Sequence, residues 1–118
     1  MSSVLVIGYD PYAFPTPGVD GDAIQAALDK DLARLAELGV EAAMALIVAD
    51  STAEPTLVAS LTERPWDVVV VGGGIRKTPE LFTLFEQTVN LIRRHAPQAA
   101  IAFNTTANDT AEAAQRWL

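Results

Sequence analysis

One segment of the chain joins four consecutive valines to three glycines, two bases and the start of a helix. A helix N-terminus offers free backbone N–H groups, and glycines let an anion approach them closely. Thr78 followed by Pro79 is typical of a helix N-cap and a first helical position. We therefore expect a small anion to bind this turn, the alternative being a structural turn with solvated bases. The residues expected at the anion are Gly72, Gly73, Gly74, Arg76, Lys77 and Thr78.

The spacing of this turn differs from the known phosphate-binding fingerprints. A dinucleotide motif needs a third glycine where Lys77 stands, and a P-loop needs a glycine where Arg76 stands. The turn therefore indicates anion chemistry without naming a nucleotide or a reaction.

Polar residues follow the other expected strands and are predicted to lie at the same rim as the glycines. They are Asp10, Asp50, Ser51, Asn104 and Thr105. Such a rim suits acid–base or phosphoryl chemistry, with Asp10 as the acid or base and Asn104 or Arg76 as a stabiliser. Alternatively, Asp50 and Ser51 cap a helix, and the Asn and Thr residues only form a turn.

The segment 10–19 is longer than the usual strand-to-helix loop of about 2–6 residues. Three prolines stiffen it, and Tyr12 and Phe14 give it apolar surface to bury. We expect both rings to cover the strand ends as a lid.

Hydrophobic periodicity predicts four strand–helix units in a single domain of residues 1–118. Apolar strands that alternate with helices predict a four-stranded, mostly parallel sheet between two helical layers, a three-layer α/β fold. Right-handed crossovers give the strand order 2-1-3-4, a Rossmann-like or flavodoxin-like layout. The expected strands span 4–9, 40–49, 67–71 and 99–103, and the expected helices span 20–38, 51–63, 79–95 and 109–118.

Composition excludes several classes of function. The net charge of −7 argues against nucleic-acid binding, and the absence of cysteine removes thiolate and zinc-thiolate sites. The sequence Asp20-Gly21-Asp22 lacks the further ligands of a calcium loop, so we expect no metal and no cofactor. No stretch is long enough to span a membrane, and no basic signal-peptide region precedes the first strand, so a cytoplasmic protein is expected.

Two apolar features predict a partner. The helix expected over 79–95 has an apolar arc of about 180°, wider than the ~100° stripe of a helix with one buried side. The strand expected over 99–103 is apolar on both faces although it lies at an edge. We expect a homodimer, the alternative being that the last helix, with Trp117 and Leu118, covers this surface within one chain.

The segments Trp66 to Lys77, Asn90 to Pro97 and Ala99 to Thr105 resemble a family of small uncharacterised bacterial α/β proteins. The resemblance implies a Rossmann-like domain and brings no activity or catalytic residue with it. Three functions therefore stay open: a binding protein for a small anionic or nucleotide-like ligand, an enzyme that uses the same rim, and an interaction module with an inert rim.

Overall fold

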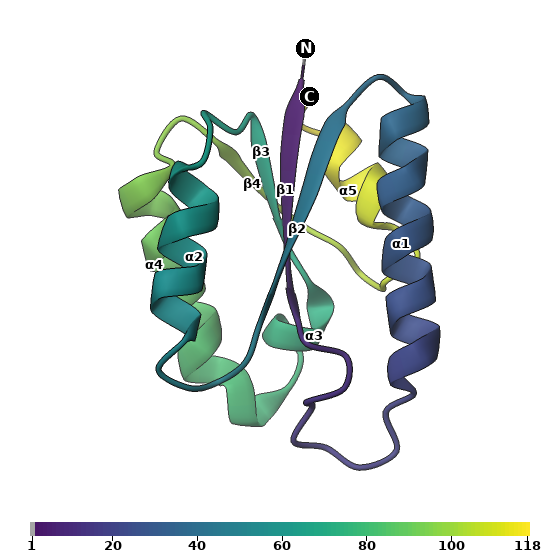
Figure 1. Ribbon diagram of the computed structural model, residues 1–118, viewed down its shortest axis with the longest axis vertical. Coiled ribbons are helices and arrows are strands. Elements are labelled where there is room, and N and C mark those ends of the chain that lie inside the picture. Colours follow the sequence, from purple (N-terminus) through teal and green to yellow (C-terminus); the bar gives the residue numbers. More distant parts are fainter. Residues whose placement is uncertain (1) are drawn as a thin grey trace.

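A computed structural model describes residues 2–118 and shows one parallel sheet between two layers of helices (Figure 1). The strands are β1 (Ser3–Tyr9), β2 (Glu41–Ile47), β3 (Val68–Val71) and β4 (Ala100–Phe103). They lie in the order β2-β1-β3-β4, and each neighbouring pair is parallel. The prediction of a three-layer α/β fold with strand order 2-1-3-4 is therefore confirmed.

The helices divide between the two faces of the sheet. α1 (Gly21–Glu37) and α5 (Thr110–Gln115) cover one face, and α2 (Ala53–Thr62) and α4 (Phe82–His95) cover the other (Figure 1). A single helical turn, α3 (Gly73–Arg76), follows β3, and a 3-10 turn, η1 (Pro79–Leu81), leads into α4. No helix within residues 2–118 has the length and hydropathy to cross a membrane.

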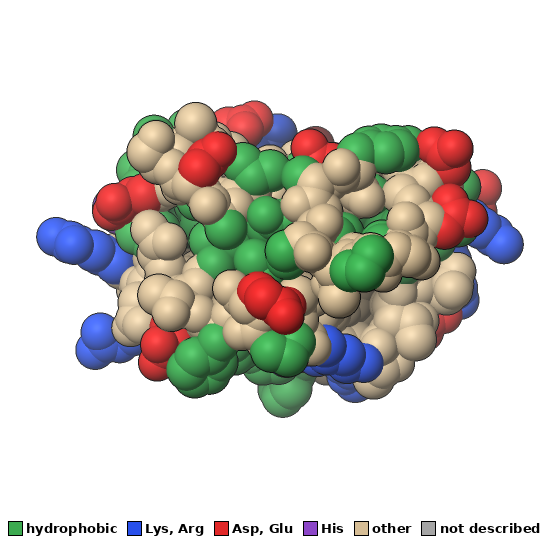
Figure 2. Space-filling view, turned by 90° about the horizontal axis from the view of Figure 1, so that it is seen from below, with side chains coloured by type: hydrophobic (Ala, Val, Ile, Leu, Met, Phe, Trp, Pro, Cys, Tyr) green, Lys and Arg blue, Asp and Glu red, His purple; other side chains and the backbone are tan. Residues whose placement is uncertain are grey.

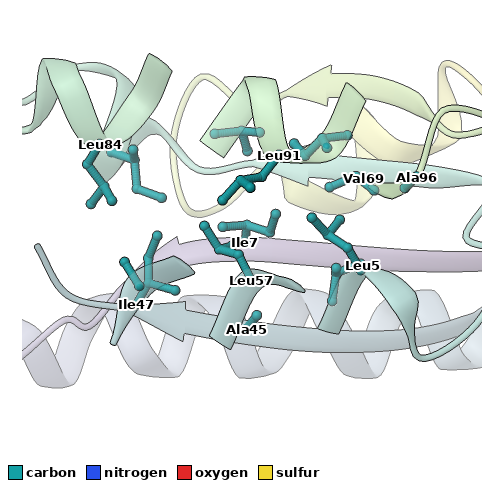
Figure 3. Close-up of a cluster of buried hydrophobic side chains, with 14 of the residues drawn as sticks. Leu5, Ile7, Ala45, Ile47, Leu57, Val69, Leu84, Leu91 and Ala96 are labelled. Carbon is teal, nitrogen blue, oxygen red and sulfur yellow. The ribbon is translucent and has the colours of Figure 1, made fainter. Parts of the chain in front are cut away.

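β3 lies in the interior because its four valines are apolar on both sides of the sheet. Val68 and Val70 pack toward α1 and α5, whereas Val69 and Val71 pack toward α2 and α4. All four are fully buried. Figure 3 shows the larger of the two clusters, in which sheet residues such as Ile7 meet Leu57 of α2 and Leu91 of α4. Alternating contacts on two faces are what a continuous apolar strand in a parallel sheet provides.

The start of the third helical segment differs from the prediction. The glycine turn itself is helical, with Gly72 at its N-cap position, and α4 begins only at Phe82. Thr78 precedes Pro79 as expected, but its side chain makes no capping bond, because its hydroxyl donates to the carbonyl of Gly74 at 2.6 Å. The single long helix over 79–95 is therefore two pieces, and the glycines belong to a separate turn.

The last helix does not cover α4. α5 packs against α1 and against β3 and β4, on the face of the sheet opposite to α4. Trp117 is 61% exposed, and Leu118 is also exposed. The alternative that the last helix, with Trp117 and Leu118, covers the apolar surface of α4 is therefore wrong.

Candidate functional site

A cavity of about 190 Å³ lies at the carboxyl ends of the two central strands. In the strand order β2-β1-β3-β4, the chain that leaves β1 continues to β2 on one side, and the chain that leaves β3 continues to β4 on the other side. The direction of the connections therefore reverses between β1 and β3. Open α/β sheets bind ligands at such a switch point. Figure 2 shows this end of the molecule, with hydrophobic side chains in its middle and acidic side chains scattered around them. The cavity is lined by Gly8, Tyr9, Phe14, Ile24, Leu28, Gly72, Gly73, Gly74, Lys77, Asn104, Thr105, Thr106 and Ala107.

Phe14 forms the wall that the long loop after β1 contributes. Its ring packs on that of Tyr9 with 5.1 Å between centroids. It also packs directly on the backbone of Gly74, since a Cβ there would lie 2.6 Å from Phe14 Cζ. Gly74 is therefore required by the close approach of an aromatic ring rather than by an anion.

Tyr12 does not join Phe14 in covering the strand ends. Its side chain is 67% exposed, packs beside Gly21 at the start of α1, and donates its hydroxyl to Asp22 at 2.8 Å. That hydrogen bond, together with a small loss of solvation, raises the pKa of the Tyr12 phenol. The expectation of a two-ring lid is thus correct for Phe14 and wrong for Tyr12.

Asn104 holds the polar side of the cavity together. Its side chain is 2% exposed, accepts from the backbone N–H of Gly73 at 2.7 Å, and donates to the hydroxyl of Thr110 at 2.9 Å. Both ends of the amide are therefore used to join α3 to α5. Asn104 therefore positions the cavity wall, with its amide held at both ends by α3 and α5.

The two bases of the glycine turn point in different directions. Lys77 lines the cavity, and its ammonium group donates to the backbone carbonyl of Thr105. Arg76 donates to the backbone carbonyl of Asn104, and its guanidinium lies over the ring of Phe103, 5.5 Å from the centroid. Of the two, only Lys77 can bring positive charge to a ligand in the cavity.

The glycine backbone offers fewer free N–H groups than the sequence predicts. The N–H of Gly72 donates to the carbonyl of Ile7 at 2.8 Å, and the N–H of Gly73 donates to Asn104. The helix that starts here has only four residues. Any attraction for an anion at this place must therefore come mainly from the side chain of Lys77.

The remaining polar residues of the rim do not face the cavity, and the two aspartates bond backbone groups of their own turns. Asp10 accepts from the N–H of Tyr12 at 2.9 Å, and Asp50 accepts from the N–H of Thr52 at 2.8 Å. Hydrogen bonds from the Thr52 side chain and backbone lower the pKa of Asp50. Neither acid lines the cavity, and neither does Ser51, which is exposed. Within residues 2–118, no carboxylate lines the cavity at all.

Thr105 belongs to a loop that is held in place by hydrogen bonds to Asp109. Asp109 accepts from the backbone N–H groups of Thr105 and Thr106 at 2.9 and 3.0 Å and from the Thr105 hydroxyl. Partial burial raises the pKa of Asp109, but these hydrogen bonds together outweigh burial and leave it below its usual value. The loop that faces Lys77 is therefore fixed by a charged aspartate at neutral pH.

Sequence reasoning missed the part of the wall that α1 supplies. Ile24 and Leu28 line the cavity from the first turns of α1. They belong to the apolar stripe of that helix, whose periodicity indicates a buried face without distinguishing core from ligand site. Position along the helix was the available signal, because the start of α1 lies beside the carboxyl ends of the strands (Figure 1).

The described part of the chain holds no group of three or more His, Asp or Glu side chains arranged to bind a metal ion. No protein-family model, curated protein or solved structure matches this chain.

Proposed function

We propose that this chain is a cytoplasmic binding protein for a small anionic or nucleotide-like molecule. One ring of the ligand occupies the cavity between the ends of β1 and β3, and its anionic group lies beside Lys77. The observation that carries the proposal is the half-open, mostly apolar cavity at the switch point, with a single base at its polar side.

The size of the cavity limits the ligand. An apolar cavity of about 150 Å³ holds one benzene molecule, and pockets for drug-sized ligands measure about 300–1,000 Å³. At about 190 Å³, this cavity accommodates one ring system and leaves the remainder of a larger ligand outside. A nucleotide bound here has its base enclosed and its phosphate at the mouth.

The lining favours a ring with a negative substituent over a neutral one. Phe14, Ile24 and Leu28 supply apolar contacts, and Lys77 supplies the positive charge. When the ligand is bound, the Lys77 ammonium exchanges its contact with the Thr105 carbonyl for a contact with the ligand's anion. A charge-assisted bond of this kind is stronger than the neutral bond that it replaces.

Binding fits the site better than catalysis. The lining residues include no Asp, Glu, His or Cys, so an acid–base reaction would depend on Lys77 or on the hydroxyl of Tyr9. That hydroxyl is held at the end of β2, where it accepts from the N–H of Ala49 at 3.1 Å. The enzyme alternative therefore has no geometric support comparable to that for binding.

The test is calorimetric titration with pairs of probes that differ only in charge: benzoate against benzamide, and adenosine monophosphate against adenosine. We expect the anionic member of each pair to bind more tightly and inorganic phosphate alone to bind weakest. Lys77→Met should weaken the anionic probes about tenfold, which corresponds to ~1.4 kcal/mol, and leave the neutral probes unchanged.

Lys30→Met is the matched control, because Lys30 is an exposed lysine of α1 that does not line the cavity. If no probe binds, or if both lysine variants weaken binding equally, the proposed function is wrong.

A further inference from the structure

β4 presents an open edge whose free backbone groups can be identified. The N–H of Ala100 donates to the carbonyl of Asp67 at 2.9 Å, so Ala100 and Ala102 direct their backbone groups toward β3. Alternation along a strand then directs those of Ile101 and Phe103 outward. No described strand pairs with this edge.

Two of the outward groups already have partners. The carbonyl of Phe103 accepts from Arg116 at 2.9 Å, and the N–H of Ala99 donates to the carbonyl of Ala96 at 3.0 Å. The groups left open are the N–H and carbonyl of Ile101, the N–H of Phe103 and the carbonyl of Ala99.

An apolar surface adjoins this edge. Val89 and Ile101 line one groove, and the ring of Phe85 meets that of Phe103 with 6.2 Å between centroids. Phe82 is 61% exposed and Phe103 is 38% exposed. We call these five residues the β4 edge surface. α5 lies on the other face of the sheet and does not cover this surface. Of α3, the Arg76 guanidinium lies over one of its rings, that of Phe103.

We propose that a second copy of this chain binds the β4 edge surface through a two-fold axis at Ile101. The two β4 strands pair antiparallel and join the sheets into one of eight strands. Ile101 of each copy exchanges both of its backbone bonds with Ile101 of the other, and the N–H of Phe103 donates to the carbonyl of Ala99 of the second copy. This register uses the open groups and leaves the two occupied groups in place.

Charges on α4 select a second copy over a foreign strand. Glu86 and Arg93 are both exposed, and they lie seven positions apart on the side of α4 that carries Phe82 and Val89. Within one helix they are about 10.5 Å apart along the axis, too far to pair. In an antiparallel pair of α4 helices centred near Val89, Glu86 of each copy lies opposite Arg93 of the other.

The helix pair and the strand pair have neighbouring centres. Val89 marks the centre of the helix pair and Ile101 marks the centre of the strand pair, and both residues line the same groove. In the proposed dimer, one two-fold axis passes through both centres, as an isologous interface requires. A peptide from another protein that adds to the edge needs no such match in α4.

The first experiment is sedimentation equilibrium of the full chain at micromolar concentration. We expect twice the 12.6 kDa chain mass. Arg93→Glu and Glu86→Arg should each raise the dimer dissociation constant about tenfold, because each creates two like-charge contacts. The double variant Glu86→Arg/Arg93→Glu should restore the affinity. Arg94→Glu makes the same change of charge on another side of α4 and should have no effect.

Amide hydrogen exchange tests the strand pairing separately. The N–H of Ile101 should become protected as protein concentration rises, whereas the N–H of Met44, on the opposite edge of the sheet, should not change. A monomer at all concentrations overturns the proposal. So does a dimer in which the double charge variant fails to recover, or in which the Ile101 amide stays unprotected, because each result means that the copies meet elsewhere or that a different partner fits this edge.

Discussion

The rim at the carboxyl ends of the strands has two regions that look alike in sequence and differ in structure. At the end of β2, the polar groups act within a few residues, as when Asp50 bonds Thr52. At the ends of β1 and β3, the contacts join segments far apart in the chain, as when Asn104 bonds Gly73. The polar groups at the end of β2 bond only one another, whereas the segments at the ends of β1 and β3 surround a cavity. Polar residues at a strand end therefore make a site only where distant segments hold a space open between them.

Asn104→Ala should produce the largest effect, because the buried N–H of Gly73 and the hydroxyl of Thr110 lose their partner. We expect the free energy of unfolding to fall by about 2–4 kcal/mol, measured by urea denaturation. Asn108→Ala, an exposed asparagine of the same loop, should change it little. Equal effects of the two variants would contradict the claim that the hydrogen bonds of Asn104 hold the segments at the ends of β1 and β3 together.

Phe14→Ala should come next, because it removes the ring that packs on Tyr9 and closes the cavity. We expect a loss of about 2 kcal/mol in unfolding free energy, less than for a fully buried phenylalanine, and the loss of benzoate binding in calorimetry. Tyr12→Ala truncates the other aromatic ring of the loop and should leave binding intact, since Tyr12 is mostly exposed. If Tyr12→Ala also fails to bind benzoate, then both rings are needed to cover the cavity, as the sequence predicted.

Two separate glycine-to-alanine variants test the close approach of the Phe14 ring to the backbone of Gly74. At Gly74 a Cβ would lie 2.6 Å from Phe14, whereas at Gly73 its nearest neighbour would be Asn104 Oδ1 at 3.5 Å, an ordinary contact. We expect Gly74→Ala to cost about 1–3 kcal/mol and to displace Phe14. Gly73→Ala should be close to neutral. Thermal denaturation measures both, and the reverse order would show that Phe14 does not pack on Gly74.

The fold could be predicted because its signals are local and repeated. The valines of β3 and the apolar stripe of α1 specify strand and helix in short windows. The site could be predicted only in part. Gly73, Lys77 and Thr105 meet at the cavity as the convergence of strand ends implies, whereas Arg76 turns away because Phe103 and the Asn104 carbonyl bind its guanidinium. Side-chain direction depends on such tertiary contacts, which one sequence does not contain.

The smallest expected effect concerns pH. The folded-state pKa of Asp109 is lowered, so its stabilising contribution is present above the unfolded value near 3.8 and is lost as pH falls through the folded value. Below about pH 4, we expect the amide resonances of Thr105 and Thr106 to shift together as the cavity loop loosens. Asp50, whose pKa is also lowered, should affect only its own turn at Thr52. Asp109→Asn should abolish the shift of Thr105 and Thr106 and leave the shift of Thr52 unchanged. If Thr105 and Thr106 still shift in this variant, another group causes their response.

Intermolecular nuclear Overhauser effects from the aromatic protons of bound benzoate test the central claim most directly. We expect contacts to the methyl groups of Ile24 and Leu28 and to the ring of Phe14, because these residues form the apolar wall of the cavity. We also expect Lys77→Met to weaken these contacts at a fixed benzoate concentration. Contacts instead to Val89 and Ile101, in the groove beside β4, would contradict the proposed function and show that the end of the sheet is not the binding site.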